Sequence, residues 1–86
     1  MHDAALAEVA TQIRSMLADR VSPEEVAVLA DEEPLVDVGL ESVGLITLVA
    51  DLQRQHGVIL DDELVLSSDT SIAVLARAVL AWGARR

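Results

Sequence analysis

The sequence predicts an all-α fold, a small four-helix bundle of three main helices and one short helix, with a long loop between the first two main helices. Three observations lead to this prediction. A chain of 86 residues has room for one small core, so we expect residues 1–86 to form a single domain. Hydrophobic residues make up 52% of the chain, and because Phe and Tyr are absent they are nearly all aliphatic. The apolar residues of three stretches also recur at helical spacing.

The first main helix is predicted over residues 4–18. Apolar residues recur there at the i, i+3, i+4 and i+7 positions of one helical face, and polar residues occupy the other faces. Asp3, just before the stretch, is a suitable N-cap. We expect the apolar stripe to face the core, because the opposite face is not basic, unlike that of a helix that lies on a membrane. The members of the stripe are Leu6, Val9, Ala10, Ile13, Met16 and Leu17.

A long connection separates the first and second main helices. Ser22 and Pro23 have the pattern of an N-cap followed by proline at the first helical position, which predicts one short turn with Val26 facing inward. Leu35 and Val38 are expected to anchor the rest of the connection on the core. Loops of this length are uncommon unless they serve a function. Here the loop delivers a serine to the start of the next helix.

The second main helix is predicted over residues 42–56, and Gly57 supplies the position after it where φ can be positive. Near its start, Val43, Leu45 and Ile46 add more apolar surface than one core stripe needs. We therefore expect part of this surface to face a partner. The alternative is that all of it belongs to the core or stands exposed without a role.

Two further elements follow. The apolar run 58–60 is too short and isolated for a sheet, and the acidic residues after it predict a short helix over about residues 61–66. The last main helix is predicted over residues 71–82, with several cap residues before it and Gly83 ending it. Trp82 is expected to anchor the edge of the core.

Charge and composition exclude several classes of function. Fifteen acidic residues against six basic ones give a net charge of −9, the wrong sign for binding nucleic acid or an anionic membrane. This charge suits a partner with a basic patch, or simply solubility. The absence of cysteine excludes disulfides, thiolate metal sites and cysteine catalysis. Met1-His2-Asp3 does not begin a signal peptide, and no apolar run reaches the ~20 residues of a membrane span, so we expect a cytoplasmic protein. We also expect it to be a monomer.

Ser42 is the candidate functional residue. At a helix start, its hydroxyl would lie near free backbone N–H groups and the positive end of the helix dipole, which favour an attached phosphate. An ordinary N-cap is the alternative. A serine hydrolase is disfavoured, because Leu40 stands where a nucleophile elbow needs glycine and His56 lies roughly 20 Å along the same helix. We therefore expect no catalytic residues.

The two histidines, His2 and His56, and the acidic turn 61–63 match no metal site, so we expect no bound metal.

The run from Pro34 to Val43 resembles the phosphopantetheine attachment site of acyl and peptidyl carrier proteins. Those proteins usually show a leucine-glycine-x-Asp-Ser-Leu pattern at this place, and this chain has Pro34-Leu35 and then Gly39-Leu40-Glu41-Ser42-Val43. The resemblance extends from about Val9 to Ala81 and implies a bundle of the acyl-carrier type. It also implies that 4'-phosphopantetheine from coenzyme A is attached to Ser42. The thiol of that arm would then hold acyl or aminoacyl groups as thioesters, and the protein itself would do no chemistry.

Departures from the family pattern bear on the pathway. Glu41 and Val43 keep the character of the usual aspartate and leucine, so we expect modification to survive. Thr47 stands where fatty-acid carriers commonly have glutamate, and residues 53–55 dilute a helix face that those carriers keep acidic. The chain therefore looks like a discrete carrier of polyketide or nonribosomal peptide assembly. A fatty-acid-type carrier and an unmodified, acidic helical adaptor are the alternatives.

The resemblance also implies the partners. They are a phosphopantetheinyl transferase, a loading enzyme of the adenylating or acyltransferase type, and condensing or tailoring enzymes. We expect these enzymes to contact the start of the second main helix and the short helix, through Glu41, Val43, Leu45, Ile46, Leu64 and Val65.

Overall fold

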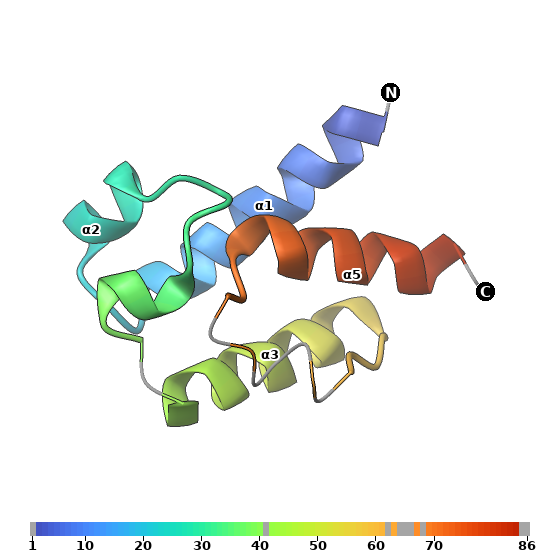
Figure 1. Ribbon diagram of the computed structural model, residues 1–86. Coiled ribbons are helices and arrows are strands. Elements are labelled where there is room, and N and C mark those ends of the chain that lie inside the picture. The colour runs from blue at the N-terminus through green and yellow to red at the C-terminus, as the bar shows by residue number, and fades with distance from the viewer. Residues whose placement is uncertain (1, 41, 62, 64–66, 68, 85–86) are drawn as a thin grey trace.

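The computed structural model describes residues 2–40, 42–61, 63, 67 and 69–84 of the chain. Over these residues it contains helices and connecting segments and no strand, as the sequence predicts. The longer helices are α1 (His2–Ala18), α3 (Ser42–His56) and α5 (Ile72–Ala84). α1 runs in the opposite direction to α3 and α5, and the connection between α1 and α3 crosses one end of the bundle (Figure 1).

α1 buries the predicted stripe. The residues of the stripe from Val9 to Leu17 are buried in the core, and Leu6 packs against them at the edge. The helix begins at His2, so Asp3 lies inside α1 and the prediction that it is the N-cap is wrong. The alanines that follow Asp3 are the strongest helix formers, and they allow the helix to extend past a cap that is favoured but not required.

The connection contains the predicted short turn as a helix, α2 (Pro23–Val28). Pro23 occupies the start of α2 and Val26 is buried, which confirms both predictions. Ser22 stands at the N-cap position but does not cap the backbone with its side chain. Its hydroxyl instead donates to the carboxylate of Glu24, with Oγ and Oε2 2.5 Å apart. This hydrogen bond lowers the pKa of the Glu24 carboxyl, because it favours the charged form.

Arg14 of α1 holds α2 and the following segment in place. Its guanidinium donates to the carbonyl oxygen of Val26 (2.6 Å), in the last turn of α2, and to that of Leu29 (2.5 Å), the residue after the helix. It also pairs with the Asp31 carboxylate at 2.6 Å. The Asp31 carbonyl in turn accepts the backbone N–H of Ala73 in α5 at 2.8 Å. The connection is thereby tied to two helices.

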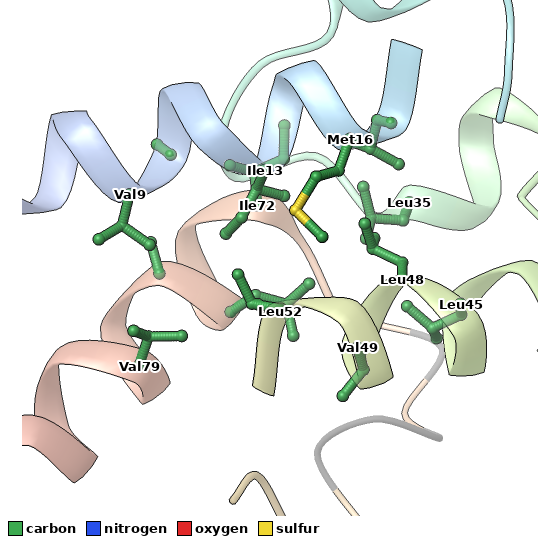
Figure 2. Close-up of a cluster of buried hydrophobic side chains, with 14 of the residues drawn as sticks. Val9, Ile13, Met16, Leu35, Leu45, Leu48, Val49, Leu52, Ile72 and Val79 are labelled. Carbon is green, nitrogen blue, oxygen red and sulfur yellow. The ribbon is translucent and has the colours of Figure 1, made fainter. Parts of the chain in front are cut away.

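The core lies between α1, α3 and α5, with the connection covering one end. Figure 2 shows aliphatic side chains from all three helices and from Leu35 meeting in one cluster. The α3 side chains in this cluster recur at the three- and four-residue spacing of one helical face, which is why α3 is helical and faces inward. The buried members from α3 and α5 are Leu45, Leu48, Val49, Leu52, Ile72, Leu75, Ala76 and Val79.

The segment after α3 begins as predicted. Gly57 has φ 64°, a left-handed conformation that ends the helix. Val58 and Leu60 are buried, and Leu60 donates its backbone N–H to the Gln53 side chain at 2.7 Å. The predicted short helix over residues 61–66 falls mostly on positions 62 and 64–66, which lie outside the described residues.

α5 is capped by Ser71. The Ser71 hydroxyl oxygen accepts the backbone N–H of Val74 at 3.2 Å, the bonding expected of an N-cap. The helix continues through Gly83 to Ala84, so the prediction that Gly83 ends it is wrong; glycine permits a helix end but does not impose one. Trp82 is partly buried against the core, as predicted. Within the described part of the chain, no helix is long and apolar enough to cross a membrane.

Candidate functional site

The candidate site lies where the connection enters α3. A 3₁₀ turn, η1 (Leu35–Val38), follows Pro34, with Leu35 buried in the core and Val38 packed at its edge. The backbone N–H of Leu35 donates to the carbonyl oxygen of Thr70 at 2.9 Å, which ties this turn to the segment before α5. These contacts confirm that Leu35 and Val38 anchor the loop. The start of α3 is therefore held in a fixed position relative to the core.

Gly39 reverses the chain between η1 and α3. It has φ 81° and ψ 15°, in the left-handed region, and its N–H donates to the carbonyl oxygen of Val36 at 3.1 Å. A Cβ at this position would meet no atom within 4 Å, so the glycine is required by backbone conformation and not by crowding.

Leu40 and Gly44 pack against each other across the entry to α3. Leu40 is buried, and a Cβ placed on Gly44 would lie 2.8 Å from the Leu40 Cδ1 atom. The glycine therefore lets the Leu40 side chain lie against the first turn of the helix. Together with Gly39, this contact directs the chain into a helix whose first residue is Ser42.

The first turn of α3 is favourable for an anion. Its backbone N–H groups have no partner within the helix and carry the positive end of the helix dipole. Helix starts of this kind bind phosphate groups. The first turn from Ser42 contains no acidic residue, so no carboxylate within it opposes an anion there.

An open hollow of about 360 Å³ adjoins this turn. It lies between the end of α1 and the start of α3, and residues on both sides of Ser42 in the sequence contribute to it. Its lining residues are Arg20, Val21, Gly39, Leu40, Val43 and Gly44. Neither Arg20 nor Val21 was predicted to belong to the site. The one signal that could have singled out Arg20 is that it is the sole basic residue of a stretch rich in acids, from Asp19 to Asp37.

A comparison with known protein families identifies the family of the chain. Residues 11–79 match the family described as "Phosphopantetheine attachment site". The chain belongs to this family. Its members carry covalently attached 4'-phosphopantetheine, so the protein is a carrier protein of the acyl and peptidyl carrier type. No curated protein and no solved structure matches the chain.

Carrier proteins of this family interact with phosphopantetheinyl transferases and other enzymes, and exposed apolar residues on α3 are candidate contacts. Val43 is 71% exposed and Ile46 is 50% exposed. Leu45 is only 8% exposed and belongs to the core, which corrects the expectation that it is available to a partner. A helix turns about 100° per residue, so Leu45 shares the face of Leu48 and Val49. Glu41, Leu64 and Val65 lie outside the described residues.

The charge of α3 in this carrier is neutralised. Asp51 is its acidic residue, and the Asp51 carboxylate pairs with Arg20 (Oδ2 to Nη2, 2.6 Å) on one side and with Arg54 on the other. Thr47 donates its hydroxyl to the carbonyl oxygen of Gly44 at 2.9 Å. The exposed face of α3 therefore presents apolar side chains more than charge.

The histidine of α3 lies at the opposite end of the helix from Ser42. His56 lies in the last turn of α3, and its Nε2 atom is buried without a hydrogen-bond partner. The 15 residues of α3 place His56 about 20 Å from Ser42 along the axis, too far for proton transfer. His2 lies in the first turn of α1. Among the described residues, no group of three or more His, Asp or Glu is placed to hold a metal ion.

Proposed function

We propose that residues 1–86 form a single carrier domain and that Ser42 carries the 4'-phosphopantetheine arm. The observation that supports this most strongly is the position of Ser42, the first residue of α3 directly after the left-handed Gly39 and the buried Leu40. A phosphodiester on Ser42 would meet the free N–H groups and the positive dipole end of the first turn.

The protein acts as a tether and not as a catalyst. The attached arm supplies a thiol that holds an acyl or aminoacyl group as a thioester. The chain contributes a rigid base, because η1 and Leu40 fix the start of α3. Tethering raises the effective concentration of the intermediate at each enzyme without any new contact to it. No histidine near Ser42 is needed for this role.

We place the carrier in the cytoplasm, in polyketide or nonribosomal peptide assembly, with an adenylating enzyme or acyltransferase loading it and condensing or tailoring enzymes using it. The assignment to polyketide or nonribosomal peptide assembly is supported by the surface of α3, where Asp51 is paired with two arginines and Val43 and Ile46 are exposed. A fatty-acid carrier would present a more acidic helix there. The mass of the group loaded in producing cells separates aminoacyl, polyketide and fatty-acyl cargo.

The attachment is tested by incubating the purified protein with coenzyme A and a promiscuous phosphopantetheinyl transferase. We expect intact-mass spectrometry to show the addition of one arm to the wild type and none to Ser42→Ala. Ser22→Ala is a matched control, because Ser22 also stands at a helix N-terminus but outside the site, and we expect it to be modified fully.

Modification of Ser42→Ala would contradict the assignment of the attachment residue. Failure of the wild type to gain mass with any transferase would instead favour the unmodified adaptor, which keeps the bundle and its acidic surface without a cofactor.

A further inference from the structure

The hollow between α1 and α3 has the chemistry of a binding site. Three of its six lining residues, Val21, Leu40 and Val43, present apolar side chains, and two more are glycines that leave it open. Arg20 is the one charged residue of the lining. The hollow thus places a cation beside an apolar wall, close to the position where Ser42 begins α3.

Arg20 is held in place and still has hydrogen-bonding capacity. Its guanidinium donates from Nη1 to the carbonyl oxygen of Met16 at 3.0 Å and from Nη2 to the carboxylate of Asp51 at 2.6 Å. A guanidinium has more N–H donors than these two bonds use. The Arg20 side chain is 22% exposed, so it can be reached from the hollow. Guanidinium groups bind phosphate oxygens well because several donors lie in one plane.

Two other hollows in the described part of the protein lack this combination. One, of about 180 Å³, is lined by Glu25, Glu33 and Asp37 among others, and its negative charge would repel a phosphate. The other, of about 170 Å³, lies between α1, α5 and the connection, and contains the acidic Asp31 and Glu32 beside Arg77. Neither is lined by a residue of α3.

We propose that the hollow receives the near half of the 4'-phosphopantetheine arm. Arg20 pairs with the phosphodiester, and Val21, Leu40 and Val43 contact the geminal methyl groups of the pantoyl unit that follows it. The order of the groups along the arm, an anion and then a branched apolar unit, matches the cation and apolar wall of the hollow. This inference rests on the proposed attachment at Ser42.

The docking has a consequence for the carrier. Arg20 and the apolar wall hold the near half of the arm against the protein, while the thiol end stays free to enter an enzyme. An enzyme that binds the whole arm has to compete with these contacts.

The experiment uses holo protein in which the chain is ¹³C-labelled and the arm, transferred from coenzyme A, is not. In the wild type, isotope-filtered NMR is expected to show nuclear Overhauser effects between the pantoyl methyl protons and the side chains of Val21, Leu40 and Val43. Arg20→Gln is expected to weaken them roughly fivefold, since it removes one partly screened ionic contact. Asp51→Asn is the matched control, because it breaks the same Arg20–Asp51 pair but keeps the guanidinium, and is expected to retain them.

Two results would overturn the inference: no contact between the pantoyl methyls and the hollow in the wild-type holo protein, or equal contacts in Arg20→Gln and Asp51→Asn. Circular dichroism of both variants shows whether the bundle is intact. A third variant, Val21→Ala, shortens the apolar wall but keeps the cation, and it is expected to lose contacts independently of Arg20. Failure of the arm to attach would contradict the proposed function instead, and intact mass distinguishes that result before any contact is measured.

Discussion

Gly39 shows how one residue sets the geometry of the site. It turns the chain between η1 and α3 with φ 81°, and the residues on either side of it, Val38 and Leu40, both pack on the core. A side chain at this position would find free space but an unfavourable backbone conformation. The start of α3 therefore depends on the conformational freedom of this glycine.

Replacing Gly39 by alanine should lower the free energy of unfolding by about 1–2 kcal/mol, the cost of a left-handed alanine. The measurement is chemical denaturation followed by circular dichroism. Gly39→Asn is the matched control, because asparagine tolerates the left-handed region, and a smaller loss is expected. Equal stability of the wild type and Gly39→Ala would show that the turn can be formed in another way.

At the scale of elements, α2 and η1 are too short to be stable alone. α2 has 6 residues, well below the length at which isolated helices form in water. Tertiary contacts stabilise it, chiefly the buried Val26 and the three acceptors bound by Arg14. Since the same connection carries η1 and Gly39, the contacts of Arg14 help position the proposed attachment site from a distance.

Substituting Arg14 by glutamine should loosen the connection and cost about 1–3 kcal/mol of stability, because two carbonyl oxygens lose a charged donor. Hydrogen exchange of the Leu29 and Glu33 amides is expected to accelerate more than exchange within α5. Asp31→Asn removes only the exposed ion pair and is expected to cost under about 1 kcal/mol. If both variants behave alike, the carbonyl contacts of Arg14 contribute little.

Over the whole molecule, much of the negative charge lies apart from the exposed apolar residues of α3. Much of the acidic charge lies in the connection, while the carboxylate of Asp51 in α3 is paired with two arginines. Charge in the connection would steer a basic partner toward the carrier, and apolar contact on α3 would hold it. The acids of the connection are Asp19, Glu24, Glu25, Asp31, Glu32, Glu33, Asp37 and, next to α3, Glu41.

This separation predicts that Ile46→Asp lowers kcat/KM for modification by a phosphopantetheinyl transferase roughly tenfold, because a half-exposed apolar contact is replaced by an unpaired charge. The rate of mass gain measures it. Val28→Asp is the matched control, since Val28 is 83% exposed on α2 and receives the same charge away from α3. A rate loss in Val28→Asp as large as that in Ile46→Asp would show that net charge matters and the α3 surface does not.

The sequence by itself determined the main elements and the family. The bounds of α3 were predicted correctly because both ends are encoded locally, by the motif before Ser42 and by Gly57 after His56. The inward turn at Val26 and the anchors Leu35 and Val38 were also predicted, since apolar residues within a polar loop leave water by packing on the core.

The tertiary structure alone decided which apolar residues of α3 face outward and what surrounds the site. Leu45 is buried while Val43 and Ile46 are exposed, because the direction of the core relative to α3 depends on how α1 and α5 pack. Arg20 meets Asp51 across 31 positions of the chain, and the hollow beside α3 exists only because the end of α1 lies there. Local patterns encode turns and helix ends, whereas contacts between distant residues arise only when the helices assemble.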